Sequence, residues 1–266
     1  MTALRLTPSF AFGSRRALRM IERNLLVYKH GWLVLFSGFF EPLFYLLSIG
    51  FGLGRLVGDV AGPGGQPIPY ALFVAPALLA ASAMNGAITE STFNFFFKLN
   101  YDKTFASILT TPMSPADISL GELAWALIRG ALYTIGFLAV MVLFGLVRSP
   151  LILLTLPGAL LIGFAFAAVG MAATSFMRTW QDFDLIQLVI LPMFLFSGTF
   201  FPLDSFPEGV RILIQLTPLY HGVDLLRTLA VGVVGPDMLV HIAYLTIMGL
   251  VGLALVSRRL DKLLLK

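Results

Sequence analysis

The chain has no cysteine and few charged side chains. Charged residues make up 12% of its 266 residues, hydrophobic residues make up 58%, and its mean hydropathy is +0.90. The absence of cysteine excludes disulfides, thiol chemistry and thiolate metal sites. Soluble domains carry about 25% charged residues, and a soluble fold of this length could not bury so much apolar surface. The composition therefore indicates an integral membrane protein whose solvent is lipid.

The motifs of soluble enzymes and nucleotide-binding proteins are also missing. A P-loop needs a lysine directly after a glycine, and no lysine of this chain follows a glycine. No nucleophile elbow, zinc-protease motif or dinucleotide fingerprint occurs. His30, His221 and His241 have no second ligand at metal-site spacing. We therefore expect no catalytic residue, metal or cofactor in this chain, and we expect any ATP and magnesium to be bound by another subunit.

Long apolar runs are abundant, and they are continuous rather than alternating. Crossing a bilayer takes about 20 mostly apolar residues in a helix, whereas the strands of a membrane barrel alternate polar and apolar residues. The sequence thus predicts an all-α membrane protein with six transmembrane helices, forming a single domain over residues 1–266. The predicted spans are 32–53, 70–93, 120–147, 151–176, 183–201 and 238–256, and a continuation of the second span to residue 97 stays open.

Basic residues predict the orientation of these spans. The formal charge of +4 does not indicate nucleic acid, because Lys and Arg cluster at the chain ends and in alternate loops. With the N-terminus inside, 13 of the 18 Lys and Arg fall in inside segments, 4 fall outside and 1 lies within a helix. Since inside segments carry the excess of Lys and Arg, we expect both termini to be cytoplasmic.

Three segments outside the predicted spans have distinctive sequences. Residues 1–30 are predicted to be cytoplasmic and to hold a basic amphipathic helix, with Leu18, Ile21, Leu25 and Tyr28 at helical spacing. Residues 98–119 form the longest inside loop, with a short amphipathic helix over 103–109. Residues 59–69 are rich in Gly and Pro and predict an external loop.

The segment 202–234 is apolar but interrupted by prolines. Pro202, Pro207 and Pro218 divide it into pieces of about half a span, and proline ends helices because it has no amide proton. We therefore expect two short helices here, lying at the outer interface or dipping into it.

Ionisable residues at membrane depth are candidate functional residues, since burying a charge there costs about 2.5 kcal/mol or more. Glu41 lies midway along the first predicted span, before Pro42. It is either a proton or substrate site or, as we favour, an interior side chain that pairs with groups freed by the proline. Glu122 and Arg129 share one face of the third span but are two turns apart, too far for a direct pair.

For Glu122 and Arg129 we weigh interior or subunit packing against a gating contact, and we treat Asn85 and Glu90 in the same way. His221, Asp224 and Arg227 are spaced three apart, so neighbours touch if the segment is helical. They form either an outer-leaflet headgroup site or exit gate, or an ion-pair cluster that anchors an interfacial helix, which we favour.

Several stretches, taken in order, resemble the type-2 ABC export permeases. The likeness is strongest to the nodulation-type lipo-oligosaccharide exporters, with the daunorubicin-resistance-type drug exporters nearby, and it covers nearly the whole chain. Single short pieces are weak signals, but three in the same order are strong. The stretches are 41–46 (EPLFYL) with 50–54 (GFGLG), 111–115 (TPMSP) with 121–125 (GELAW), and 197–202 (SGTFFP) with 218–227 (PLYHGVDLLR).

The resemblance implies a bacterial inner-membrane permease subunit that exports a drug, lipid or lipo-oligosaccharide. It implies a dimer, most simply of identical copies, with each copy bound to a cytoplasmic ATPase. Residues 98–119 would hold the coupling helix, residues 1–30 the connecting helix and residues 202–234 an external re-entrant hairpin. The coupling residues implied are Asp102, Phe105, Leu109 and Pro112. The Gly/Pro loop 59–69 departs from the family pattern.

Two other functions stay open. A secondary carrier driven by an ion gradient would show inverted repeats and paired broken helices, and neither is visible in the sequence. A membrane scaffold without transport activity would show no substrate flux with any partner. Transport without ATP that depends on a proton gradient would favour the carrier.

Overall fold

The computed structural model describes residues 15–29 and 40–264, and every structural statement below concerns that part of the chain. The predictions for residues 1–14 and for the start of the first span, 32–39, fall outside it. In chain order, with η marking π- and 3₁₀-helices, the elements are α1 (Arg15–Tyr28), η1 (Leu46–Leu53), α3 (Gly54–Val57), β1 (Asp59–Ala61), η2 (Pro63–Gly65), β2 (Pro67–Pro69), α4 (Tyr70–Thr89), η3 (Glu90–Asn94), η4 (Phe97–Tyr101), α5 (Thr104–Ile108), α6 (Pro115–Leu143), η5 (Pro150–Leu154), α7 (Thr155–Thr174), η6 (Trp180–Asp182), α8 (Phe183–Phe196), η7 (Leu203–Ser205), α9 (Glu208–Gln215), α10 (Pro218–Val231) and α11 (Asp237–Leu264).

Within the described residues, five helices are long and apolar enough to cross a membrane. They cover Phe40–Val57, Tyr70–Tyr101, Pro115–Leu143, Pro150–Thr174 and Asp237–Leu264. The predicted span over 183–201 corresponds to the shorter α8, whose 14 residues end at Phe196. The helix stops there because Gly198 adopts a positive φ of 71° and turns the chain.

Local sequence explains where α6 starts. Ser114 caps the helix: its Oγ accepts a hydrogen bond from the amide of Asp117 (3.2 Å), and the Asp117 carboxylate accepts one from the Ser114 amide (3.0 Å). Pro115 follows at the first helical position, where its missing amide proton costs nothing. This capping box begins the helix five residues earlier than the hydropathy pattern predicted.

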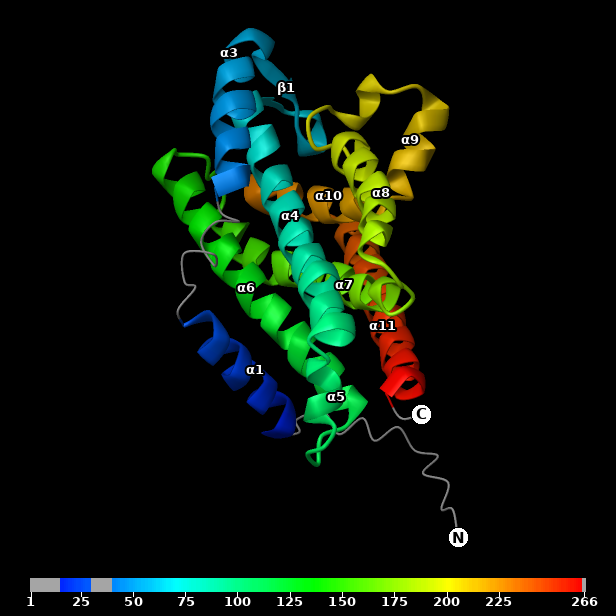
Figure 1. The fold of residues 1–266 in the computed structure, drawn as a ribbon. Coiled ribbons are helices and arrows are strands. Elements are labelled where there is room, and N and C mark those ends of the chain that lie inside the picture. The colour runs from blue at the N-terminus through cyan, green and yellow to red at the C-terminus, as the bar shows by residue number, and fades with distance from the viewer. Residues whose placement is uncertain (1–14, 30–39, 265–266) are drawn as a thin grey trace.

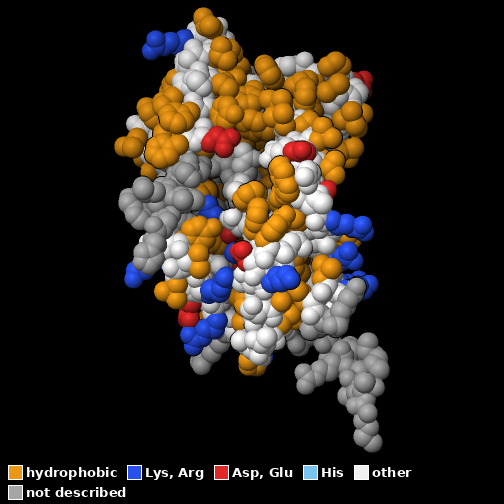
Figure 2. Space-filling model, in the orientation of Figure 1, with side chains coloured by type: hydrophobic (Ala, Val, Ile, Leu, Met, Phe, Trp, Pro, Cys, Tyr) orange, Lys and Arg blue, Asp and Glu red, His pale blue; other side chains and the backbone are white. Residues whose placement is uncertain are grey.

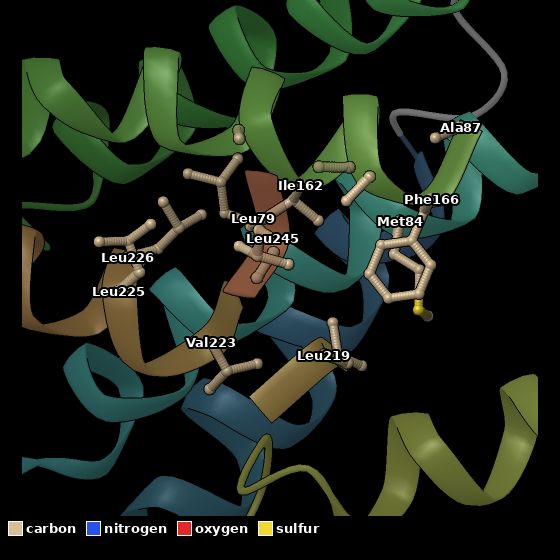
Figure 3. Packing of buried hydrophobic residues seen from close by; sticks show 14 of the residues in the cluster. Leu79, Met84, Ala87, Ile162, Phe166, Leu219, Val223, Leu225, Leu226 and Leu245 are labelled. Atoms are coloured by element: carbon tan, nitrogen blue, oxygen red, sulfur yellow. The ribbon is translucent and has the colours of Figure 1, made fainter. Parts of the chain in front are cut away.

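The helix α4 lies at the centre of the bundle. In its most apolar stretch 83% of the residues are buried, because α6, α7, α10 and η1 pack against it (Figure 1). Figure 3 shows Leu79 and Met84 of α4 meeting Ile162 of α7, Leu219 of α10 and Leu245 of α11. The helix then continues through two π-helical segments, η3 and η4, to Tyr101, four residues beyond the continuation to residue 97 that the sequence left open.

The predicted external loop 59–69 forms a small hairpin. Strands β1 and β2 pair antiparallel, with Asp59 opposite Pro69 and Ala61 opposite Pro67. Gly64 and Gly65 both have φ of 74°, a conformation that side-chain-bearing residues rarely adopt, so the turn depends on them. The hairpin stands above α10 at the end of the molecule opposite α5 (Figure 1).

The helix α1 packs one face against α6. Met20 and Asn24, each 1% exposed, face α6, whereas Leu18 and Leu25 of the predicted apolar stripe are 55% and 52% exposed. Gly121 permits this approach, because a Cβ there would lie 2.4 Å from the Cβ of Met20. The polar Asn24 faces inward because its amide donates to a buried carboxylate of α6.

Charged and apolar side chains separate along the molecule. On the face shown in Figure 2, most Lys and Arg lie on the half that carries α5 and the end of α11, while hydrophobic side chains dominate the opposite half. This distribution agrees with the Lys and Arg bias read from the sequence.

Candidate functional site

Four buried charges meet where the extension of α4 lies against α6, near α5. The Nζ of Lys98 lies 2.6 Å from Oε2 of Glu122 and 3.8 Å from Oε1 of Glu90. The guanidinium of Arg129 donates to the other oxygen of Glu90 in a short contact. No hydrogen bond or ion pair joins Glu122 to Arg129 in the described chain. As the two-turn spacing predicted, Glu122 and Arg129 do not pair directly. They are linked through Lys98 and Glu90.

The helix α1 supplies polar partners to the four charges. The Asn24 amide donates to Glu122 (3.4 Å), and its carbonyl oxygen accepts from Lys98 (3.3 Å). Tyr28 stacks on Trp125, with ring centroids 5.3 Å apart, and its hydroxyl accepts from Arg129 (3.4 Å). Burial, and then the charge of Glu90, raise the pKa of Tyr28, so its hydroxyl stays protonated. These polar contacts hold α1 on the bundle.

The electrostatic balance of the four charges explains how the bundle holds them. Glu90, Glu122 and Arg129 are 2%, 3% and 7% exposed, and a single charge buried to that degree would be strongly unfavourable. Two carboxylates and two cations sum to zero, and each has at least one close partner of opposite sign. We call Glu90, Lys98, Glu122 and Arg129 the ion cluster.

A polar cavity of about 240 Å³ opens beside the ion cluster. Arg129 and Tyr133, which are joined by a 2.8 Å hydrogen bond, line one wall. The other walls combine amide and hydroxyl groups with aromatic rings, and they are formed by Tyr28, Glu41, Tyr45, Ser82, Asn85, Thr89, Asn94 and Phe194. Such a mixture suits a polar group that carries both hydrogen-bonding atoms and an apolar face.

Glu41 lies on the rim of this cavity, which corrects its expected position in the interior. Its side chain is exposed, because the helix Phe40–Val57 lies at the edge of the bundle, with only 17% of its residues buried. Glu41 therefore faces the cavity mouth rather than packed helices.

An apolar groove of about 570 Å³ runs next to the polar cavity. It separates α8 from α7 and the end of α4, and Ile186, Ile190 and Met193 of α8 form one side. Thr89 and Phe194 line the polar cavity, while their chain neighbours Ile88 and Met193 line the groove. The two compartments thus adjoin along α4 and α8.

The predicted coupling residues surround α5. Phe105 is fully buried and packs on Phe95, with ring centroids 5.0 Å apart. Asp102 is exposed just before α5, and Leu109 is half-buried just after it. The carbonyl of Pro112 accepts a 2.7 Å hydrogen bond from Arg16 of α1. The exposed surface here thus comes from Asp102 and Pro112, while Phe105 fixes α5 to the extension of α4.

On the far side of the bundle, α10 and α11 bring two histidines together. Nδ1 of His221 and Nδ1 of His241 lie 2.7 Å apart, and Nε2 of His241 lies 3.0 Å from the Asp224 carboxylate. His221 also stacks on Tyr244, at 4.0 Å. Burial, and then the neighbouring His241, lower the pKa of His221. The two histidines, which are 20 residues apart in sequence, therefore lie in contact in the structure.

Arg227 does not pair with Asp224, although the spacing suggested an ion-pair cluster. Its Nε donates to the carbonyl of Phe73 (3.1 Å), its Nη2 donates to that of Gly198 (2.6 Å), and its guanidinium lies over the Phe73 ring at 3.7 Å. Asp224 turns instead to His241 on α11. Both partners come from elements distant in sequence, which helical spacing on α10 does not reveal.

Sequence reasoning weighed Glu90 but left Asn94 and Lys98 out of the candidate site. The three residues are four apart and form a polar stripe on one helix, a signal present in the sequence. Asn94 joins the cluster through a 2.8 Å hydrogen bond to Glu90. The contribution of His241 had no such signal, because it depends on how α10 crosses α11.

Comparison with known proteins agrees with this architecture. The family model described as ABC-2 type transporter matches residues 16–231. The chain belongs to the ABC-2 type transporter family. It is 33% identical to Nodulation protein J of Rhizobium leguminosarum bv. viciae over 254 residues, covering 93% of this chain and 96% of that protein. Identity to Nodulation protein J of Sinorhizobium fredii is 34% over 245 residues, covering 90% and 92%.

The predicted resemblance to nodulation-type ABC-2 permeases is therefore confirmed. The chain is a multi-pass membrane protein of an ABC-2 exporter and acts as its transport subunit.

Proposed function

We propose that this permease pairs with a cytoplasmic ATPase and exports an amphipathic substrate, such as a drug, a lipid or a lipo-oligosaccharide, across the bacterial inner membrane. The observation that carries the proposal is the polar cavity that adjoins an apolar groove along α8. An amphiphile would place its headgroup among Asn85, Arg129 and Tyr133 and its apolar tail against Ile186 and Ile190.

A chain of buried contacts supports coupling to the ATPase. Phe105 of α5 packs on Phe95, which lies between the two π-helical segments that carry Glu90 and Lys98. Glu90 contacts Lys98 and Arg129, and Arg129 lines the polar cavity. Pushing on α5 would therefore move the cavity wall. The ATPase, which would hold ATP and magnesium, would dock on the exposed surface around Asp102 and Pro112.

The same proposal includes six spans with both termini cytoplasmic. The helix α8 rises from the end of α7 to α9 at the opposite end of the molecule (Figure 1), which supports its role as the fifth span. Residues 202–234, with α9 and α10, then form an external re-entrant hairpin, and the whole chain forms one transmembrane domain. Arg178 precedes α8 and Glu208 follows it, so they would lie on opposite sides.

A second copy of the chain completes the proposed transporter. Glu41 is exposed at the edge of the bundle, on the rim of the polar cavity. A carboxylate at this depth is costly against lipid. A second permease facing the helix Phe40–Val57 would keep lipid away from Glu41 and enclose the cavity between the copies.

Filling the apolar groove tests the export function. Ile186→Trp would occupy the groove, whereas Leu188→Trp places the same ring on the exposed face of the same helix, where Leu188 is 69% exposed. The permease and its ATPase are reconstituted in vesicles, and uptake of a fluorescent amphiphile is followed with and without ATP. We expect Ile186→Trp to lose most ATP-dependent uptake and Leu188→Trp to keep it. Equal uptake by both variants would contradict the proposed path, and uptake that needs no ATP would contradict the exporter.

A further inference from the structure

Two small polar chambers lie beneath the β1–β2 hairpin. One, of about 200 Å³, is lined by Tyr220 and Arg227 of α10. The other, of about 250 Å³, is lined by His241 and Asp237 of α11. Asp224 of α10 lines both chambers, and the tip of the hairpin covers both. The hairpin is therefore the roof of a divided cavity at the end of the molecule opposite α5 (Figure 1).

Arg227 is the one basic side chain among the residues that line the first chamber, which also include Asp204 and Asp224. Arg227 is 6% exposed, and no carboxylate of the described chain lies within ion-pair distance of it. Its Nε and Nη2 are engaged by backbone carbonyls, while Nη1 has no hydrogen-bond acceptor among the described residues. A buried cation without a counter-ion is unfavourable, and a free pair of guanidinium protons suits phosphate oxygens.

Carboxylates line the second chamber. One carboxylate oxygen of Asp224 lies within hydrogen-bond distance of His241. The other oxygen has no hydrogen-bond donor among the described residues. Asp237, in the first turn of α11, lines the same chamber. Asp204, which lines the first chamber, forms an ion pair with Arg211 at 3.2 Å. Two carboxylates facing one chamber favour a cation there.

We propose that Arg227 and Asp224 form an external binding site for a zwitterionic headgroup, with its phosphate on Arg227 and its ammonium on Asp224. The two chambers meet at Asp224 and Pro63, so one small molecule with both charges can occupy them together. The hairpin, whose role the sequence left open, closes the site from above. The external position of the site rests on the orientation given in the proposed function.

A cysteine reporter tests this site directly, because the chain has no cysteine of its own. Pro63→Cys places a thiol where the chambers meet, and Thr228→Cys on α10 is a second reporter should the hairpin not tolerate the change. The complex of permease and ATPase is reconstituted in phosphatidylglycerol vesicles and labelled from outside with a membrane-impermeant maleimide. We expect soluble phosphoethanolamine to slow labelling several-fold, and inorganic phosphate or ethanolamine to do so much less.

Substitutions test whether protection by phosphoethanolamine depends on the proposed contacts with Asp224 and Arg227. Asp224→Asn keeps the shape of the side chain but removes its charge, and we expect it to abolish protection by phosphoethanolamine. Arg227→Lys is expected to weaken protection, because lysine lacks the planar fork. Asp204→Asn changes the compensated carboxylate of the same cavity and should keep full protection. Adding phosphatidylethanolamine to the vesicles, without soluble ligand, tests whether the headgroup is that of a lipid.

Several results would overturn the site. Equal protection by inorganic phosphate would reduce it to an anion site, and unchanged protection in Asp224→Asn would remove the ammonium contact. Labelling needs no ATP, so protection with no ATP-driven transport would contradict the proposed function alone. Labelling only after the vesicles are opened would contradict the external orientation.

Discussion

At the scale of single residues, the ion cluster decides how α1, α4 and α6 are held together. Each cation of the cluster contacts a carboxylate on another part of the chain. Removing one partner of a buried ion pair costs about 3–5 kcal/mol, because the other charge stays buried. Removing both partners costs far less, since the desolvation penalty disappears with them.

Lys98→Met should therefore destabilise the protein by about 3–5 kcal/mol by leaving Glu122 without its closest cation. The double variant Lys98→Met with Glu122→Leu should recover most of that loss. Thermal unfolding in detergent measures both changes. As a control, Arg19→Met removes an exposed partner of Glu22 and should change stability by about 1 kcal/mol or less. A double variant no more stable than Lys98→Met would contradict this account.

The sequence predicted which polar residues are buried better than it predicted which residues they contact. Glu122, Arg129, His221, Asp224 and Arg227 were all identified from depth and spacing, and four of them are buried. Their contacts depend on crossings between helices distant in sequence, which periodicity does not encode. Glu41 was placed in the interior because hydropathy gives depth in the membrane and not position across the bundle.

At the scale of elements, α5 joins the surface proposed to bind the ATPase to the rest of the bundle. It has only five residues, so its position depends on Phe105 in the pocket beside Phe95. Isolated helices of this length are not stable. The sequence predicted this short helix, but not the π-helical segments η3 and η4 before it, because π turns arise from tertiary packing rather than residue preference.

Phe105→Ala should release α5 and uncouple ATP hydrolysis from transport. We expect a large loss of ATP-dependent uptake, while the permease still assembles with its ATPase through Asp102 and its neighbours. Ser107→Ala, on the exposed side of the same helix, is the matched control and should transport normally. Uptake and co-purification of the ATPase are measured for both variants. Unchanged transport in Phe105→Ala would contradict coupling through α5.

At the scale of the whole molecule, the number of spans depends on α8. Five described helices are long enough to cross a bilayer, and with an odd number the two ends of the chain would lie on opposite sides. The Lys and Arg bias predicts both ends inside, and that prediction requires a sixth crossing. With its 14 residues, α8 is short for a span of about 20, so the flanking η6 and residues 197–201 would complete it.

Single-cysteine labelling decides this count. In intact cells, a membrane-impermeant maleimide should label Glu208→Cys, after α8, and should not label Arg178→Cys, before it. Ser107→Cys near α5 is the inside control and should react only after the membrane is opened. Labelling of Arg178→Cys and Glu208→Cys from the same side would show that α8 does not cross.

The neutrality of the ion cluster has a consequence for how voltage acts on the transporter. Moving one elementary charge through a membrane potential of 100 mV takes about 2.3 kcal/mol. Glu90, Lys98, Glu122 and Arg129 carry no net charge together, so a shift of the whole group along the membrane normal does almost no electrical work. The inner wall of the cavity can thus change position at the same free energy in an energised cell and in a depolarised one.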